Sequence, residues 1–206
     1  MNSQDHSPSQ LRKTLRAARS NIPPKMQQQA AQRICDALIT DPIFLRSKHI
    51  AFYMAVEGEL STERIALQAE NRGKKCYLPL ISDFIRPWES TRLLFQPFSP
   101  RACDLKPNQY GILEPQSDPK YSANPALLDL VIAPLVAFDS KLNRMGMGKG
   151  YYDRTFGKAL KWRRPKLLGL AYTSQQVDRL ESTSLDVPMD GILTEQGIIW
   201  KKESQN

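Results

Sequence analysis

The sequence of 206 residues contains few of the residues that build disulfide frameworks, zinc sites or histidine-centred triads. Its three cysteines, Cys35, Cys76 and Cys103, are odd in number and widely spaced. This pattern argues against a disulfide framework and a zinc site, and it predicts reduced, structural thiols. His6 lies near the start of the chain and His49 at the edge of an expected strand, so no histidine-centred triad is indicated.

Long apolar segments are also missing. No apolar run approaches the length of a membrane span, and residues 1–8 lack the apolar stretch of a signal peptide. We therefore expect a soluble, cytoplasmic protein with no membrane partner. The length fits a single domain over residues 1–206, with residues 1–8 and 202–206 disordered, and we expect a monomer.

Acidic residues are scarce in two parts of the chain that are rich in Lys and Arg. Residues 6–35 hold six of these cations and no acid, and residues 140–170 hold nine cations opposed by Asp153 alone, in a chain of net charge +8. If the two basic segments converge in the fold, they form a positive site for a polyanion. ATP and nucleic acid both fit that description, so charge alone leaves the partner open.

Apolar periodicity predicts strands that alternate with helices. Such an order is typical of an α/β fold: a mainly parallel or mixed sheet with helices on both faces, in three layers. Helices are expected near 11–20, 26–38, 61–71 and 150–160, and strands at 49–56, 75–81, 92–96, 129–138, 166–172, 191–193 and 197–200. Residues 110–115 are expected to form a loop near the site. Because ligands bind beyond the carboxyl ends of parallel strands, we expect residues 56–62 and the segment after residue 138 to share one site.

A glycine-rich run follows directly on the apolar residues 130–138. Residues 143–153 read Asn-Arg-Met-Gly-Met-Gly-Lys-Gly-Tyr-Tyr-Asp. Glycines let successive backbone N–H groups point at one anion, and Arg144 and Lys149 add positive charge. A helix that begins near Gly150 would present its N-terminus to the same anion, and Asp153 in its first turn suits a magnesium ion. The run therefore predicts a nucleotide site.

The run differs from the two best-known nucleotide loops. A P-loop needs Ser or Thr after its lysine, where this chain has Gly150, and the dinucleotide fingerprint needs glycine where this chain has Tyr151. A glycine-rich turn without a ligand is the alternative interpretation. The flanking charges and the Tyr-Tyr-Asp tail favour a ligand.

Together with residues 134–139 (Pro-Leu-Val-Ala-Phe-Asp), this run resembles the signature of the 5-formyltetrahydrofolate cyclo-ligase family, also called methenyltetrahydrofolate synthetases. The resemblance extends from the basic N-terminal segment to residues 186–188. It implies conversion of 5-formyltetrahydrofolate to 5,10-methenyltetrahydrofolate with cleavage of ATP to ADP and phosphate, through a phosphorylated formyl intermediate. ATP, Mg²⁺ and a reduced folate, which could carry a polyglutamate tail, are the implied ligands.

The resemblance also implies which residues form the site. The implied ATP-binding residues are Arg12, Arg144, Met145, Gly146, Met147, Gly148, Lys149, Gly150, Tyr151 and Tyr152. The implied folate-binding residues are Met54, Glu59, Met147, Gly148, Lys149, Gly150 and Tyr151. The implied catalytic residues are Arg144, Lys149 and Tyr151, and the implied magnesium ligands are Asp153 and Asp186.

The chain departs from the family's pattern at Pro8, where Lys or Arg is common four residues before Arg12. We therefore expect one ATP contact to be lost, or to be supplied by Lys13 or Arg16. Two other functions stay open. A nucleic-acid-binding protein would use the basic N-terminal helix, but residues 6–35 contain no aromatic residue for base stacking. A phosphosugar isomerase or acyl-CoA enzyme of related architecture would need a sugar-phosphate loop and a catalytic carboxylate that we do not identify.

Overall fold

The computed structural model describes residues 7–81, 92–102, 104–108, 110–116, 118–157 and 165–202. In these residues the helices are α1 (Pro8–Ser20), α2 (Pro24–Ile39), α3 (Pro42–Arg46), α4 (Glu63–Asn71) and α5 (Tyr151–Phe156), with short 3-10 helices η2 (Pro119–Tyr121), η3 (Pro125–Leu127) and η5 (Thr173–Gln175). The strands are β1 (His49–Ala51), β2 (Lys75–Ile81), β3 (Leu93–Pro97), β4 (Leu105–Pro107), β5 (Leu113–Pro115), β6 (Leu130–Pro134), β7 (Ala137–Phe138), β8 (Arg144–Met145), β9 (Lys166–Leu170), β10 (Gly191–Thr194) and β11 (Gly197–Trp200).

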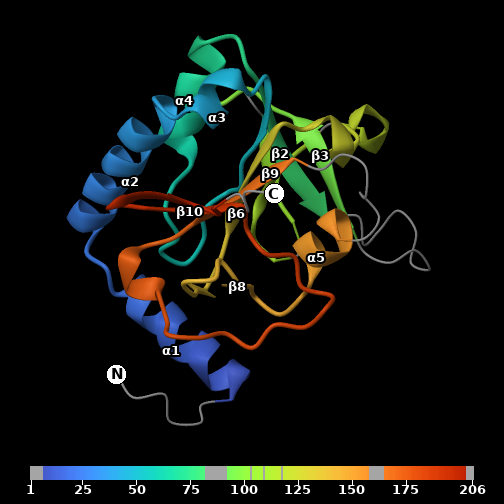
Figure 1. Ribbon diagram of the computed structural model, residues 1–206. Coiled ribbons are helices and arrows are strands. Elements are labelled where there is room, and N and C mark those ends of the chain that lie inside the picture. Colours follow the sequence, from blue (N-terminus) through green and yellow to red (C-terminus); the bar gives the residue numbers. More distant parts are fainter. Residues whose placement is uncertain are drawn as a thin grey trace.

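Seven of the strands form one mixed sheet in the order β11-β10-β9-β6-β1-β2-β3. The five central strands run parallel, and β3 and β11 pair antiparallel at the two edges. β4 pairs with β5 and β7 with β8 in two separate hairpin-like sheets. Helices α2 and α4 lie on one side of the main sheet and α5 on the other (Figure 1). The expected fold class, an α/β sheet with helices on both faces, is confirmed.

The side chains of the central strands alternate between two apolar cores. In β6, Leu130 and Ile132 belong to the core under α2 and α4, whereas Val131 and Ala133 belong to the core on the other face. Successive residues of a strand point to opposite faces. A strand that is buried on both faces must therefore be apolar at every position, which explains the continuous apolar run in the sequence.

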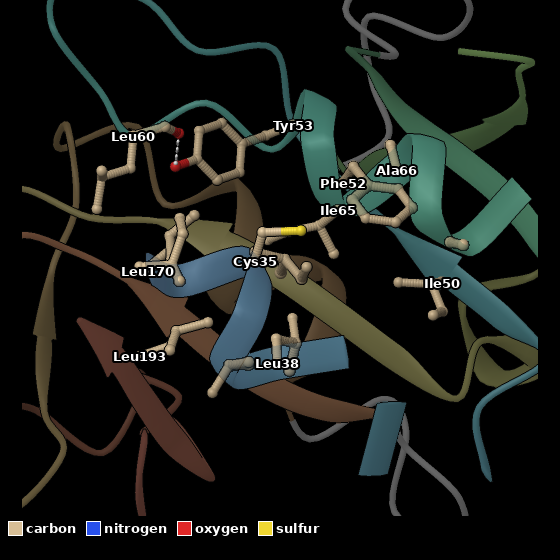
Figure 2. Close-up of a cluster of buried hydrophobic side chains, with 14 of the residues drawn as sticks. Cys35, Leu38, Ile50, Phe52, Tyr53, Leu60, Ile65, Ala66, Leu170 and Leu193 are labelled. Carbon is tan, nitrogen blue, oxygen red and sulfur yellow. Dashed lines mark hydrogen bonds between the residues drawn. The ribbon is translucent and has the colours of Figure 1, made fainter. Parts of the chain in front are cut away.

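Helices α2 and α4 fill the first core with residues spaced three or four apart. Leu38 of α2 and Ile65 of α4 are fully buried in the same cluster as Ile50 of β1 (Figure 2). Ile34 of α2 is fully buried in this cluster as well. This spacing places the side chains on one stripe of each helix, as the sequence predicts. The opposite core contains Phe156 of α5 together with side chains of irregular segments, which are Leu142, Val187 and Met189.

Two expected strands end early. The strand expected at residues 49–56 stops at Ala51, because the chain turns through Glu57 and Gly58, which have φ of 49° and 75°. Tyr53 fixes this turn by donating its hydroxyl to the Leu60 carbonyl at 2.7 Å (Figure 2). The strand expected at 129–138 stops at Pro134, which has no N–H to continue a ladder, and the chain resumes as β7 in a different sheet.

Other boundaries agree more closely. Helices α2 and α4, strand β2 and the β10–β11 hairpin match their predicted ranges within about two residues, which is the ordinary scatter of such boundaries. Helix α1 ends at the predicted residue but begins at Pro8 instead of residue 11. Residues 110–115 were expected to be a loop, which is wrong for β5. The expected helix 150–160 is α5 up to Phe156, and residues 158–164 lie outside the described ranges.

The expectation of disorder at the two ends falls mainly on residues 1–6 and 203–206, which are outside the described ranges. Ser7 and Pro8 nevertheless belong to the start of α1, because the Ser7 hydroxyl accepts from the Gln10 N–H. Within the described part of the chain, no helix is both long and apolar enough to cross a membrane.

The cysteines are buried thiols where they are described. Cys35 and Cys76 are both free and buried, and Cys103 lies outside the described residues. Burial raises the pKa of the Cys76 thiol to about 12, and it also raises the pKa of Cys35. Both side chains are therefore un-ionised near neutral pH, in agreement with the structural role expected from the sequence.

We expect Leu38→Ala to lower the free energy of unfolding by about 2–5 kcal/mol, because it leaves a cavity between α2 and the sheet. Leu45→Ala is the matched control: Leu45 is 56% exposed in α3, and its loss should change stability by no more than about 0.5 kcal/mol. Urea denaturation measures both. Equal midpoints for the two variants would contradict the assignment of Leu38 to the core.

Candidate active site

Helix α1 brings the two basic segments of the chain together. Arg12 Nε donates a hydrogen bond of 3.0 Å to the carbonyl of Gly146. Its guanidinium carbon also lies 3.8 Å from where a Cβ on Gly148 would be. In Figure 1, α1 runs beside β8, from which the glycine loop (residues 146–150) continues. The convergence on which the sequence argument for a polyanion site depended is therefore observed.

The glycine loop takes a conformation that requires glycine at two positions. Gly148 and Gly150 have φ of 89° and 65°, a region that other residues rarely adopt. A Cβ on Gly150 would also lie 2.8 Å from Arg154 Nη1. Arg154 Nη2 donates to the Lys149 carbonyl at 2.7 Å, so a cation of α5 holds the far end of the loop while Arg12 holds its beginning.

Asp139 organises the turn between β7 and β8 that precedes the glycine loop. Its carboxylate accepts from the backbone N–H groups of Lys141, Asn143 and Leu180 and from the side chain of Asn143, at 2.9–3.1 Å. Burial acts to raise the pKa of Asp139, but hydrogen bonds from Asn143, Leu180 and Lys141 outweigh it and hold the pKa below its ordinary value. The buried carboxylate is therefore satisfied and charged near neutral pH.

Arg144 and Asp153 form an ion pair behind the glycine loop. Arg144 Nη2 lies 2.6 Å from Asp153 Oδ1, and the guanidinium lies over the Tyr152 ring at 5.3 Å. The same Asp153 oxygen accepts from the N–H of Val187 at 3.1 Å. Arg144 was expected to face phosphate and Asp153 to face a metal ion. In this structure the two side chains face each other.

The second expected metal ligand is placed differently. Asp186 is exposed, and its carboxylate accepts from the N–H and hydroxyl of Thr183 at 2.7 and 3.0 Å. The neighbouring Val187 N–H reaches Asp153, so the two aspartates come from adjoining segments whose carboxylates make different bonds. Among the described residues, no three His, Cys, Asp or Glu side chains gather as a metal-binding group. Magnesium would fit here only with most of its oxygen ligands from phosphate and water, an arrangement common for this ion.

The loop between β1 and α4 (residues 52–62) carries Glu59 and Met54. A Cβ on Gly58 would lie 2.9 Å from the Arg19 carbonyl, so this loop packs directly on α1. The Glu59 side chain is only 7% exposed, and its Oε1 lies 3.4 Å from Arg19 Nη1. Burial raises the pKa of Glu59 above its ordinary value, and the Arg19 guanidinium opposes that shift. Met54 is partly buried and packs against the core under α2 and α4.

Buried tyrosine hydroxyls surround the Glu59–Arg19 pair. Burial raises the pKa of Tyr152, and the negative charge of Glu59 adds to the shift. Burial likewise raises the pKa of Tyr172 to about 12, and the Arg19 charge opposes that shift. Neither hydroxyl has a hydrogen-bond partner within the described part of the chain. Because buried polar atoms are normally paired, these hydroxyls are suited to a ligand.

Lys149 and Met147 are exposed in the glycine loop, and Tyr151 is partly buried against the second core. The Lys149 ammonium lies 6.0 Å from the centre of the Tyr110 ring, which brings the turn between β4 and β5 next to the glycine loop. Met147 is 48% exposed. The Arg154 guanidinium lies over the Tyr151 ring at 5.4 Å. The expectation that residues 110–115 lie near the site agrees with the position of Tyr110.

The remaining arginines of α1 bind the protein itself. Arg16 makes a bidentate pair with Glu57 at 2.5–3.0 Å, and Lys13 is exposed. From the sequence, Arg19 was only one of the six cations of residues 6–35. A signal was present, because Arg19 stands four residues after Leu15 and eight after Leu11, which places it on the apolar side of the helix. Asp139 gave no comparable signal, since a single aspartate after a strand is common in turns.

Comparison with known proteins gives a consistent result. A model of the 5-formyltetrahydrofolate cyclo-ligase family matches residues 4–195. The proteins named 5-formyltetrahydrofolate cyclo-ligase from Haemophilus influenzae and Escherichia coli K12 are 36% and 32% identical, over 89% and 87% of this chain and 95% and 96% of their own. The NMR structure of Aquifex aeolicus 5,10-methenyltetrahydrofolate synthetase superposes with a TM-score of 0.78 at 28% identity, over 97% of this chain and 95% of that one.

We expect Asp139→Asn to lower the free energy of unfolding by about 2 kcal/mol near neutral pH, because it removes the charge that four hydrogen bonds stabilise. A carboxyl whose pKa is depressed by folding contributes stability above its unfolded pKa and loses it as pH falls through the folded value. The difference between wild type and Asp139→Asn should therefore shrink in acid. Urea denaturation across this pH range, with the exposed Asp178→Asn as control, measures it; a difference independent of pH would contradict the assignment.

Proposed function

The chain belongs to the 5-formyltetrahydrofolate cyclo-ligase family, and from this membership we propose that it converts 5-formyltetrahydrofolate to 5,10-methenyltetrahydrofolate while cleaving ATP to ADP and phosphate. The observation that carries the proposal is the bond from Arg12 to Gly146, which joins the basic helix to the glycine loop. A triphosphate with Mg²⁺ is the polyanion that suits this combination of cations and backbone amides.

The chemistry explains why the site needs charge more than a nucleophile. A formamide oxygen leaves poorly as hydroxide and well as phosphate. In the proposed reaction the formyl oxygen attacks the γ-phosphorus and ADP leaves; the folate N10 then attacks the activated carbon, loses its proton, and the oxygen departs with phosphate. Such steps depend on alignment and on neutralising phosphate charge. The described histidine, His49, bonds instead to the Tyr77 hydroxyl at 2.8 Å.

We assign the phosphate-binding role to residues of two segments. Arg12 and Lys149 would neutralise phosphate charge, while the backbone of residues 146–150 would line the phosphate chain. Arg144, which lies beside Asp153, would neutralise charge on the γ-phosphate. Magnesium, when bound, would draw phosphate oxygens into alignment and offset their charge. Asp153 would hold it, with Asp186 reaching the ion only if its carboxylate leaves Thr183.

We assign the folate-binding role to the loop between β1 and α4 and to the helix that follows the glycine loop. The Glu59 carboxylate is suited to accept hydrogen bonds from the donor edge of a pterin, and Met54 offers an apolar surface beside it. Tyr151 would contact the folate through its ring and complete the catalytic group with Arg144 and Lys149. Burial raises the pKa of Tyr152, the residue next to Tyr151, and the charge of Glu59 adds to that shift, so the segments that carry Glu59 and Tyr151 lie near each other.

The nucleic-acid alternative requires the arginines of α1 to be available to an outside partner. Arg12, Arg16 and Arg19 instead bond to Gly146, Glu57 and Leu135, respectively. These arginines bond to separate segments of the protein, and Lys13 is an exposed cation of the helix. The helix therefore lacks the row of exposed Lys and Arg with which such proteins follow a phosphate backbone, whereas Arg12 beside the glycine loop can still meet a small anion there. This observation favours the small-molecule site.

A direct assay tests the proposal. Purified protein mixed with 5-formyltetrahydrofolate, ATP and Mg²⁺ should produce the near-ultraviolet absorbance of the methenyl product. Omitting ATP, or removing Mg²⁺ with a chelator, should abolish the rise, because uncompensated triphosphate charge blocks transfer. Absence of any ATP-dependent rise would reject the proposed function, and a rise unaffected by the chelator would reject the metal assignment alone.

We expect Arg12→Gln to raise the KM for ATP about tenfold, the effect of losing one charge-assisted hydrogen bond near a bound anion. Lys13→Gln tests the expectation that Lys13 substitutes for the cation missing at position 8. Because Lys13 is exposed, whereas Arg12 bonds to the glycine loop, we expect Lys13→Gln to have little effect. Steady-state kinetics at saturating folate compare the two, and a larger effect at Lys13 would reverse the assignment.

A further inference from the structure

We propose that Arg19 is a positioning residue for folate binding, which holds the Glu59 carboxylate in place and ionised so that it can accept hydrogen bonds from the substrate. This inference rests on the proposed function, because the role of Glu59 toward folate comes from that proposal. It assigns Arg19 a task different from that of Arg12 on the same helix, which meets the glycine loop.

The Arg19 guanidinium is held at three points. Its Nε donates to the Glu57 carbonyl at 3.2 Å, its Nη1 donates to the Leu135 carbonyl at 3.3 Å, and the same Nη1 lies 3.4 Å from Glu59 Oε1. A planar guanidinium fixed by two carbonyls presents its charge in one direction. Arg19 therefore sets the position of the Glu59 carboxylate relative to α1.

The burial of Arg19 argues for a functional reason to keep it. Its side chain is only 2% exposed. A buried ion pair can often be replaced by apolar residues without loss of stability, and the same side of α1 already carries Leu11 and Leu15. Arg19 Nη2 also has no hydrogen-bond partner among the residues described, although it is buried. A guanidinium retained only for stability would be expected to satisfy its donors.

Glu59 is faced by few charges. Arg19 comes from α1, and Tyr152 comes from α5. Tyr53, Glu57 and the Val56 N–H come from the same loop as Glu59. Of these groups, only Arg19 carries a positive charge. Burial raises the pKa of Glu59, and the Arg19 charge opposes it. Without Arg19, the carboxyl would be protonated at a higher pH and would lose part of its ability to accept hydrogen bonds.

Arg19 also connects the folate-binding loop to the base of the glycine loop. The Leu135 carbonyl that accepts from Arg19 accepts from Gln175 Nε2 at 2.9 Å as well. The next residue, Val136, donates its N–H to the Met145 carbonyl at 2.7 Å, at the start of the glycine loop. The backbone that supports the proposed ATP site therefore also holds the Glu59 carboxylate in position. Such a shared support suits a reaction between two bound substrates.

The test is the pH dependence of kcat/KM for 5-formyltetrahydrofolate in Arg19→Gln. We expect a loss of roughly tenfold or more near neutral pH, the effect of removing a charge partner from a buried carboxylate. We also expect the acid limb of the profile to move to higher pH, whereas the KM for ATP changes much less. A variant that lost folate and ATP parameters equally, with the acid limb unmoved, would show a structural role and overturn the proposal.

Three comparison variants test whether the effect is specific to the Arg19–Glu59 interaction. Arg33→Gln removes an exposed cation of α2 and should match wild type. Arg16→Gln removes an exposed pair with Glu57 in the same loop, and it should leave the acid limb where it is. Glu59→Gln should abolish the acid limb, and adding Arg19→Gln to it should cost less than Arg19→Gln costs alone, because both changes break one interaction. Fully additive losses would contradict the proposal.

Arg19→Lys keeps the test decisive if Arg19→Gln does not fold, as judged by its thermal melting. Lysine retains the charge but cannot bridge both carbonyls, so folate kcat/KM should fall with a smaller movement of the acid limb. Wild-type values in whichever variant folds would overturn the role of Arg19. Calorimetry separates this failure from a failure of the proposed function: wild-type protein that binds no 5-formyltetrahydrofolate would reject the function itself.

Discussion

The contacts of helix α1 with two loops hold this site together. Arg12 bonds to the glycine loop through the Gly146 carbonyl, and Arg19 bonds to the loop between β1 and α4 through the Glu57 carbonyl and Glu59. One loop follows β1, and the glycine loop follows the β7–β8 hairpin, which continues the chain from β6, the parallel neighbour of β1. The topology therefore already places the two loops near one edge of the sheet. The sheet alone does not fix how they face each other. The helix does, because it contacts both with cations on one side of its surface.

In the glycine loop, the backbone conformation and the charged side chains each favour the binding of an anion. Positive φ at Gly148 and Gly150 turns the chain in a way that side chains with a Cβ resist, while Arg12 and Arg154 hold carbonyls of the same loop from either end. These hydrogen bonds turn the carbonyl oxygens of Gly146 and Lys149 toward Arg12 and Arg154. A loop whose carbonyls are engaged in this way presents fewer acceptors to an incoming phosphate, which lowers the electrostatic barrier to binding.

The fold was largely predictable from the sequence, whereas the contacts between the candidate site residues were not. Apolar periodicity located α2 and α4 because their apolar residues, spaced three or four apart, form one buried stripe on each helix. It located β2 because successive residues of that strand belong to opposite cores. It failed at residues 52–56, because apolar residues predict burial and burial does not distinguish a strand from a buried turn. Phe52 and Tyr53 are as buried in the turn as they would be in a strand. Local sequence likewise could not show that Arg144 faces Asp153 or that Asp186 turns to Thr183. Those pairings depend on where Val187 passes α5, which is a long-range contact.

The same structure explains why the proposed folate site can be selective. Tyr152 and Tyr172 hydroxyls and Arg19 Nη2 are buried polar atoms without a partner in the described part of the chain. Each unpaired buried group of this kind costs about 1–3 kcal/mol. A ligand that supplies matching acceptors removes that cost, and an analogue of the same shape without them does not, so discrimination arises from the unpaired groups and not from apolar contact. Glu59 adds the opposite requirement, since a buried carboxylate accepts hydrogen bonds and repels another acceptor. In the proposed site, donors toward Glu59 and an acceptor toward Arg19 Nη2 would therefore favour a ligand, while the tyrosine hydroxyls can serve either kind of group. An apolar surface such as Met54 cannot impose such an asymmetry.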